Sequence, residues 1–149
     1  MKNRMTCLTL FFLAVMGTMY IAVAGEINKK TSDLIITING FENSEGIAKL
    51  ALINSEKNYN EDKPFQGYDL KIVDKKVVTT ISELAYGEYA VKIYHDENSN
   101  NKLDTKIFGI PTERYGFSND ARGTAGPPDY KEAAFKLDSP EKEITINIK

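Results

Sequence analysis

Hydrophobic and polar residues alternate along most of the chain from Asp33 onward, which is the period of a strand with one buried face. Leu34, Ile36 and Ile38 share one face of the first run, and the later runs repeat this pattern. The alternating runs lie at residues 34–38, 48–52, 68–72, 77–81, 87–95, 133–137 and 144–148. No segment after the N-terminal one keeps a helical period long enough to cover a sheet. The pattern predicts an all-β chain of about seven short strands.

Turn residues separate these runs and indicate how the strands connect. Residues 39–40 (Asn-Gly) and 44–46 (Ser-Glu-Gly) lie between the first two runs, so we expect those two strands to form a hairpin. The polar segment 55–66 contains Pro64 and predicts a surface connection with room for one helical turn. Short strands joined in this way favour an antiparallel β-sandwich of immunoglobulin-like or transthyretin-like type.

Residues 96–130 depart from the alternation and are far longer than an ordinary connection in a compact sandwich. Glycine, proline and aromatic residues are frequent in this segment: Gly109, Gly116, Gly123, Gly126, Pro111, Pro127, Pro128, Phe108, Tyr115, Phe117 and Tyr130. The aromatic side chains give the segment a small apolar centre, which favours one long ordered loop over disorder. We expect the function of the protein to lie in this loop.

The N-terminus has the composition of a secretory signal peptide. Lys2 and Arg4 precede an apolar run over residues 7–24, which ends in the small residues that signal peptidase accepts. We predict three parts: a signal peptide over residues 1–24, a flexible lead over 25–32, and a single β-sandwich domain over 33–149. The apolar run is close to the ~20 residues that span a bilayer, so an uncleaved anchor is the alternative. With cleavage no membrane span remains, and we expect a periplasmic or extracellular domain.

Cysteine content and charge narrow the class of protein further. The single cysteine, Cys7, lies inside the predicted signal peptide, so the mature chain has no disulfide and depends on its core, on oligomerisation or on bound metal. Loss of the signal peptide removes two positive charges and changes the formal net charge from −2 to −4. Since there is no run of lysine and arginine, the charge pattern gives no case for nucleic acid or an anionic membrane surface as a partner.

Polar residues at the start of the long loop are spaced like the ligands of a calcium loop. The five candidate ligands, at positions 1, 3, 5, 7 and 9, are Asp96, Asn98, Asn100, Lys102 (through its backbone carbonyl) and Asp104. The match is partial, because Asn101 stands at the usual glycine position and Ile107 at the usual glutamate position. Two carboxylates predict weak Ca²⁺ binding, with a dissociation constant of about 10⁻⁴ to 10⁻³ M. The alternative is a turn whose side chains bond to their own backbone.

Signals for catalysis are few. His95 ends the inward face of its strand, so a buried structural role is favoured over a catalytic or metal-binding one. Asp96, Glu97 and Glu113 near His95 carry the alternative, a small carbohydrate-active hydrolase with a pair of carboxylates. The chain has no GxSxG motif, no phosphate-binding glycine loop and no HExxH motif. We expect no enzymatic function and no catalytic or cofactor-binding residue.

The YGFSN sequence at residues 115–119 is the candidate contact with a partner. Tyr115, Phe117 and Asn119 combine aromatic rings with a polar group, as suits stacking on a sugar or a peptide. The alternative is that the aromatic residues anchor the loop to the core. Both roles remain open from the sequence.

The motifs of this region also resemble a known family. A strand ending in HDENxNxxLD, followed by GIPxExYGFSN, AxG, GPPxY and AAF, is similar to the bacterial domain-of-unknown-function family 2141. The residues that carry the resemblance are His95, Asp96, Glu97, Asn98, Asn100, Leu103, Asp104, Gly109, Pro111, Glu113, Tyr115, Gly116, Phe117, Ser118, Asn119, Gly123, Gly126, Pro127, Pro128 and Phe135. Asn101 departs from the glycine that members usually carry. The resemblance implies an exported bacterial protein with a β-sandwich fold, and it implies no activity.

These observations lead to one functional hypothesis and one alternative. The hypothesis is an exported, non-enzymatic β-sandwich, stabilised by Ca²⁺ if the polar loop binds metal, whose long loop presents a surface to a protein or glycan of the envelope or the extracellular space. The alternative is the small hydrolase that uses Asp96, Glu97 or Glu113 near His95.

Overall fold

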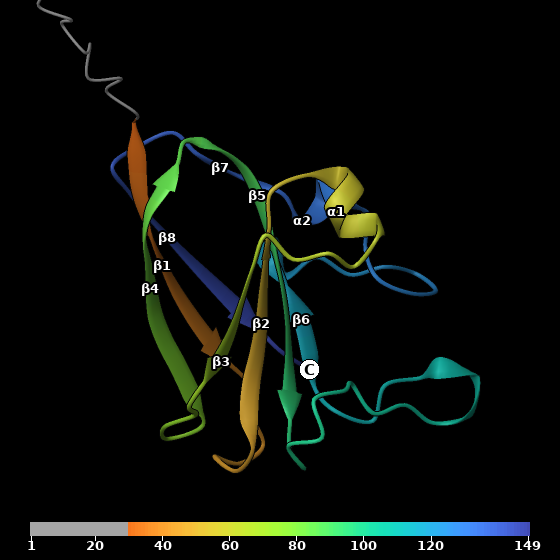
Figure 1. Ribbon diagram of the computed structural model, residues 1–149. Coiled ribbons are helices and arrows are strands. Elements are labelled where there is room, and N and C mark those ends of the chain that lie inside the picture. Colours follow the sequence, from red (N-terminus) through yellow and green to blue (C-terminus); the bar gives the residue numbers. More distant parts are fainter. Residues whose placement is uncertain (1–29) are drawn as a thin grey trace, which may run out of the picture.

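The computed structural model describes residues 30–149, which form two β-sheets packed face to face (Figure 1). The predicted signal peptide and most of the predicted lead lie outside these residues. The first strand begins at Thr31, within the range predicted as flexible, because Ser32 is buried and pairs with Leu84. No helix within residues 30–149 is long and apolar enough to cross a membrane.

Eight strands and two short α-helices make up the described region. The strands are β1 (Thr31–Asn39), β2 (Ile47–Ile53), β3 (Gln66–Leu70), β4 (Lys76–Ala85), β5 (Gly87–Asp96), β6 (Tyr115–Phe117), β7 (Phe135–Leu137) and β8 (Glu141–Asn147). The helices are α1 (Glu56–Asn60) and α2 (Tyr130–Ala133), and 3₁₀ turns cover Ile107–Gly109 and Ser118–Asp120. The predicted all-β sandwich is confirmed. β6 is the strand that the sequence pattern did not show, because it has three residues and lies inside the long loop.

The strands are divided between a smaller and a larger sheet. The smaller sheet has the order β4-β1-β8, and the larger has the order β3-β2-β5-β6, with β7 also paired to β5. β6 and β7 share one edge of β5, where β7 pairs with residues 87–89 and β6 with residues 92–94. Most neighbours are antiparallel, as predicted, but β1 and β8 are parallel.

The predicted hairpin between residues 34–38 and 48–52 is wrong. β1 pairs with β4 and β8, whereas β2 pairs with β3 and β5, so the two strands lie in different sheets. The linker between them crosses the sandwich, and its glycines have positive φ angles of 98° at Gly40 and 66° at Gly46. A Cβ at Gly40 would collide with the backbone of Ile148, and one at Gly46 with the backbone of Asp96. The turn residues therefore mark a close crossing between sheets.

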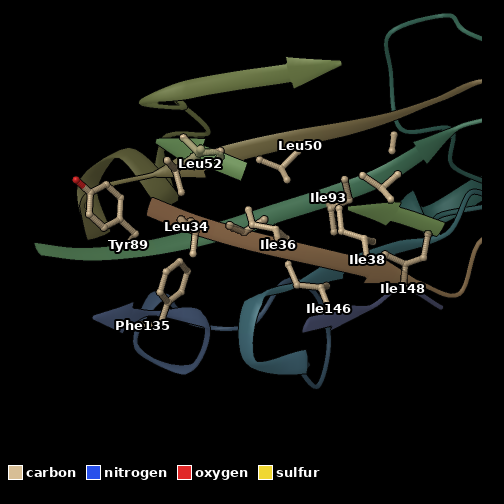
Figure 2. Close-up of a cluster of buried hydrophobic side chains, with 14 of the residues drawn as sticks. Leu34, Ile36, Ile38, Leu50, Leu52, Tyr89, Ile93, Phe135, Ile146 and Ile148 are labelled. Atoms are coloured by element: carbon tan, nitrogen blue, oxygen red, sulfur yellow. The ribbon is translucent and has the colours of Figure 1, made fainter. Parts of the chain in front are cut away.

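Apolar side chains fill the space between the two sheets (Figure 2). β1 contributes Leu34, Ile36 and Ile38, which are fully buried. The other labelled members of this core come from strands of both sheets and from the chain end: Leu50, Leu52, Tyr89, Ile93, Phe135, Ile146 and Ile148. Burial of these apolar surfaces is the main stabilising term for a domain without disulfides.

The two sheets join along one edge, where β6 meets the end of the chain. Tyr115 and Lys149 exchange two backbone hydrogen bonds of 3.2 and 3.1 Å. Gly116 faces the core here, and a Cβ at this position would lie 3.1 Å from the Cγ2 atom of Ile148. Asp120 accepts hydrogen bonds of 2.7 Å from the backbone N–H and the side-chain amide of Asn147. These contacts order the middle of the long loop.

A second hydrophobic cluster lies outside the sandwich core, where α1 and α2 pack against the larger sheet. Its buried members are Ile53, Tyr59, Ala90, Phe117, Tyr130 and Ala133. α1 begins after Ser55, whose hydroxyl oxygen accepts a 3.3 Å hydrogen bond from the N–H of Asn58. α2 begins at a capping box formed by Asp129 and Glu132. The helices cover one end of the outer face of this sheet.

Candidate binding groove

A groove of about 650 Å³ lies on the outer face of the larger sheet, the face turned away from the core. Asp62 and Pro64, which follow α1, line one end of it. Asn101 and Leu103, from the long loop, line the other end. Its volume falls within the range of about 300 to 1,000 Å³ that small-ligand sites occupy.

Small residues form the floor of the groove. Ala51 of β2 lies opposite Gly67 of β3, and both side-chain positions face outward. A Cβ at Gly67 would meet no atom within 4 Å, so the space above it is open. The neighbouring outward-facing residues, Lys49 and Tyr94, are long. The two small residues therefore leave a depression in the sheet surface.

Aromatic side chains from β5 and β6 form one wall. Tyr94, Tyr115 and Phe117 all line the groove. The rings of Tyr115 and Phe117 lie 6.0 Å apart in an edge-to-face arrangement, and Phe117 lies 6.5 Å from Tyr59 of α1. Phe117 is buried in the second cluster, whereas Tyr115 is half-buried. Burial also raises the pKa of Tyr94. Phe117 therefore anchors the loop, and Tyr115 lines the groove, where contact with a partner stays a prediction.

Two lysine–aspartate pairs provide the charged groups of the groove. The ammonium group of Lys49 lies 2.7 Å from the carboxylate of Asp69, and this hydrogen bond raises the pKa of Lys49. The ammonium group of Lys92 pairs with Asp62 and lies 4.1 Å from the centre of the Tyr59 ring. Lys92 also donates a 2.9 Å hydrogen bond to the carbonyl of Tyr59. Both positive charges are therefore matched by carboxylates at the groove itself.

Tyr115 was predicted from the sequence as a contact residue, whereas the strand residues of the groove were not. The missed residues are Lys49, Ala51, Gly67, Lys92 and Tyr94. The alternation of buried and exposed positions along β2, β3 and β5 assigns these residues to the face opposite the core. Which outward face stays uncovered depends on where α1, α2 and the long loop pack, so no local pattern identifies it.

Asn119, the third predicted contact residue, lies outside the lining of the groove. Its backbone has a φ angle of 59°, and its amide donates hydrogen bonds of 3.0 and 2.9 Å to the carbonyls of Glu132 and Ala134. The adjacent Ser118 is fully buried, and its hydroxyl accepts a 2.9 Å hydrogen bond from the N–H of Val91. Both residues hold the loop against α2 and β5.

The predicted calcium loop closes on itself through hydrogen bonds. Asp96 is fully buried, and its two carboxylate oxygens accept hydrogen bonds of 3.0 and 2.9 Å from the N–H groups of Asn100 and Asn101. The amides of Asn98 and Asn100 donate to the two carboxylate oxygens of Asp104, at 2.6 and 3.0 Å. This is the geometry of the self-bonded turn that was the alternative to a metal site.

Calcium binding at this loop would have to replace part of that network. The amide oxygens of Asn98 and Asn100 accept hydrogen bonds from the N–H groups of Asn100 and Lys102, at 3.0 and 2.8 Å, and each oxygen keeps a second lone pair. Among the residues that the structure describes, no three His, Cys, Asp or Glu side chains gather as a metal site. The candidate set has only two carboxylates, Asp96 and Asp104, so the calcium site stays a prediction.

Glu113 clamps the base of this loop. The side chain is buried, and its two carboxylate oxygens accept hydrogen bonds from the N–H groups of Glu97 at 3.0 Å and Asp104 at 2.9 Å. Both oxygens are thereby used to hold residues 97–104 as one unit. Its role in this geometry is to position the loop.

His95 is fully buried at the end of β5, as its strand register predicted. Its Nε2 atom lies 2.8 Å from the carbonyl oxygen of Glu45, and its ring packs edge-to-face on Phe41. Its Nδ1 atom lies 3.5 Å from a carboxylate oxygen of Glu97. Asp96, Glu97 and Glu113 are absent from the lining of the groove.

The chain matches the model of a protein family. The family model described as "Uncharacterized protein conserved in bacteria (DUF2141)" matches residues 36–145, which include every strand of the larger sheet. No curated protein and no solved structure matches the chain.

Proposed function

The chain belongs to this bacterial family of uncharacterised proteins, and we propose that it is an exported, non-enzymatic domain that binds a neutral saccharide in the groove on the larger sheet. The observation that carries the proposal is an aromatic-walled groove whose two lysines are each paired with an aspartate. Of the contact residues predicted in the long loop, Tyr115 and Phe117 then belong to one wall of this groove, and Asn101 and Leu103 of the same loop form one end.

The pairing of charges favours an uncharged ligand. Lys49 with Asp69 and Lys92 with Asp62 leave the groove without net charge, so an anionic or cationic ligand would meet a repelling partner beside each attracting one. A hydroxyl group both donates and accepts hydrogen bonds, which suits an adjacent ammonium and carboxylate. The C–H face of a sugar ring packs on aromatic side chains such as Tyr115. A neutral saccharide therefore matches both kinds of surface.

The N-terminal sequence supports export. Lys2 and Arg4, the apolar run over residues 7–24 and the small residues at its end have the order of a secretory signal. A chain without cysteine outside that segment folds without disulfide formation in an oxidising compartment. We infer a periplasmic or extracellular location, where envelope and environmental glycans are available as ligands.

The positions of the carboxylates support binding over hydrolysis. Asp96 and Glu113 are buried, use both oxygens to accept backbone hydrogen bonds and do not line the groove, so neither faces a ligand bound there. Glu97 is partly exposed but does not line the groove. The hydrolase alternative predicts release of reducing sugar from an oligosaccharide, abolished in Glu97→Gln. Saccharide binding without such release supports the binding role.

Binding is tested by the thermal unfolding midpoint of the protein with neutral glucose-, xylose- and N-acetylglucosamine-based oligosaccharides. A ligand of the folded state raises the midpoint as its concentration passes the dissociation constant. The groove is open above Gly67, so Gly67→Phe fills it from an exposed strand position and is expected to abolish the response. Gly67→Ala is the matched control, with the same backbone change and little added volume. A response that survives in Gly67→Phe, or one seen with peptides alone, would contradict the proposal.

Calcium at Asp96, Asn98, Asn100, Lys102 and Asp104 is the second part of the proposal. We expect Ca²⁺ to raise the unfolding midpoint only at about 10⁻⁴ to 10⁻³ M, because two carboxylates supply the charge and the internal hydrogen bonds compete. Mg²⁺ is the control cation. A midpoint that does not change up to several times this concentration would assign the loop to the self-bonded turn alone.

A further inference from the structure

The long loop carries an exposed apolar tip that the groove does not use. In Figure 1 the segment around Ile107–Gly109 extends away from the two sheets. Ile107, Phe108 and Ile110 are 80%, 97% and 60% exposed, and they surround one turn. Single exposed hydrophobic residues are common on proteins, but three at the end of a protrusion form a patch that calls for a partner.

The backbone conformation at Phe108 also indicates that this apolar tip has a partner. The N–H of Gly109 donates a 3.0 Å hydrogen bond to the carbonyl of Lys106, which makes Phe108 the third residue of a turn. Its φ angle is 71°, in the left-handed region where glycine or asparagine is the usual residue of such a turn. A bulky side chain here strains the backbone and gains no burial. An unfavourable residue held in an exposed turn indicates a contact outside the molecule.

The turn is built on a firm base. The N–H of Lys106 donates to the carbonyl of Ile110 at 2.7 Å, and the N–H of Thr112 donates to the carbonyl of Asp104 at 2.8 Å. Below them Glu113 clamps the loop through two further backbone N–H groups. Several backbone groups of the protrusion are therefore already paired, as entry into an apolar medium requires.

We propose that residues 107–110 are a membrane-contact site, which inserts Ile107, Phe108 and Ile110 into the interfacial layer of a lipid bilayer. The tip is a protrusion, and a fluid bilayer can surround it without a preformed pocket. Three side chains offer far less than the roughly 800 Å² per partner that a stable protein interface buries. A lipid surface therefore fits this tip better than a protein partner does.

The charges around the tip agree with a lipid surface. Lys102 and Lys106, which precede the inserted residues in the chain, are exposed, and no acidic residue occurs between positions 105 and 112. Lysines next to a membrane-inserting segment can approach the lipid headgroups while the apolar residues enter the layer beneath the headgroups. The acidic net charge of the whole chain opposes this attraction, so anionic lipid should raise the affinity only several-fold.

The inserted hydrocarbon predicts weak and reversible binding. The three side chains together carry about as much hydrocarbon as one myristoyl group, which alone binds bilayers with a constant of ~10⁴ M⁻¹. The tip would therefore hold the domain briefly at a membrane and leave the groove free for its ligand. Insertion of the tip does not depend on what the groove binds.

A tryptophan reporter tests insertion directly. The chain has no tryptophan, so Phe108→Trp in the full-length protein places a single indole at the tip. With vesicles of phosphatidylcholine and phosphatidylglycerol, we expect its emission to shift to shorter wavelength and to be quenched by brominated lipid. Phe65→Trp is the matched control, because Phe65 is 46% exposed beside Tyr89, away from the tip. An unchanged emission of the tip indole would overturn the proposal.

A loss-of-contact variant provides the second measurement. In I107S/F108N/I110S the co-sedimentation affinity for the same vesicles should fall at least about tenfold, since the inserted hydrocarbon is removed. The unfolding midpoint should stay or rise, because asparagine accepts the left-handed backbone. V73S/V78S removes two other exposed hydrophobic residues, at 57% and 61% exposure, and should bind like the wild type. Vesicle binding by the tip variant that equals that of the wild type would overturn the lipid assignment. The same holds if the wild type forms an oligomer in the absence of vesicles and the tip variant does not.

Discussion

The two faces of the larger sheet are made by the same five strands and have opposite properties. On the inner face Leu50, Leu52 and Ile93 are at most 3% exposed and pack against the other sheet. On the outer face Lys49 and Lys92 alternate with them, pair with carboxylates and border an open groove. Strand geometry forces the alternation, because successive side chains point to opposite sides.

The difference shows where the domain can vary without loss of its fold. The inner face is closed by the second sheet, so its residues must fill a fixed volume with hydrocarbon. The outer face is closed only at one end, by the second cluster around Tyr59 and Phe117. Between that cluster and the long loop, residues such as Ala51 and Gly67 leave space for a ligand. We therefore expect inner-face substitutions to change stability and outer-face substitutions to change binding.

The largest expected effect is at the centre of the inner face. Leu52→Ala removes a fully buried side chain and leaves a cavity, so the free energy of unfolding should fall by about 2–5 kcal/mol. Chemical denaturation followed by circular dichroism measures this change. The adjacent outward-facing Ala51→Ser is the control and should change it by less than about 0.5 kcal/mol. Similar losses for both substitutions would contradict the division between the two faces.

A smaller loss is expected at the end of the inner face. His95→Ala removes a ring that packs on Phe41 and leaves the carbonyl of Glu45 without its partner, which should cost about 2–3 kcal/mol of stability. Glu97→Gln alters only the exposed neighbour of His95 and serves as the control. A stability close to that of the wild type in the alanine variant, by the same denaturation measurement, would show that the histidine is not structural.

Where β5 leaves the sheet, a buried carboxylate holds the polar loop. Asp96→Asn exchanges one acceptor oxygen for an NH₂ group that faces a backbone donor. The free energy of unfolding should therefore fall by about 1–3 kcal/mol. Hydrogen exchange should show faster opening of residues 98–104 in this variant. Asp74→Asn, the same exchange at an exposed turn residue outside this loop, is the comparison variant. Unaltered exchange in the Asp96 variant would show that this carboxylate does not organise the loop.

High pH should loosen the covered end of the outer face. Burial raises the pKa of Tyr59 to about 12, above the value of about 10 for an exposed tyrosine. The folded state therefore holds this proton more tightly, so its stabilising effect is complete below pH 10 and is lost as the pH rises toward 12. In Tyr59→Phe this decline should be weaker, although loss of the 3.1 Å hydrogen bond to Pro128 costs about 1 kcal/mol at neutral pH. Denaturation at several alkaline pH values measures both effects, and equal pH slopes would contradict the assignment.

The smallest effect on stability is expected at the lysine–aspartate pairs of the groove. Lys49→Met keeps the aliphatic stem and removes the charge, so the free energy of unfolding should change by at most about 0.5–1 kcal/mol. Saccharide binding, measured by the midpoint shift, should weaken much more. Lys63→Met is the control, because Lys63 pairs with Glu61 outside the groove. A large loss of stability with unchanged binding would place Lys49 among the structural residues.

Local pattern predicted the strands well and their partners less well. The alternating runs correspond to β1 to β5, β7 and β8, because period-two burial is written into each run itself. The pairing partners of β1 were not predicted, since two glycine-containing turns are compatible with either a hairpin or a crossing between sheets. β6 was missed because three residues are too few to show a period.

The residues of the candidate site also fall into those that the sequence predicted and those that it did not. Tyr115 was identified from its own sequence context, as an aromatic residue in a polar loop. Lys49 and Gly67 were not, because their role depends on an outer face that no other element covers. Asn119 was read as a contact residue, but its amide is used to hold the carbonyls of α2. Whether a polar side chain bonds to a ligand or to the protein itself depends on which backbone groups the tertiary structure brings beside it.

The sequence by itself determined the all-β class, the inner faces of the strands, the ordered long loop and the family to which the chain belongs. These features follow from side-chain alternation and from local motifs, which need no knowledge of distant residues. Only the tertiary structure decided which strands pair, which sheet face stays open and where the apolar tip of residues 107–110 projects. The physical reason is that each of these depends on what packs against a surface, and the packing partners are far apart in the chain.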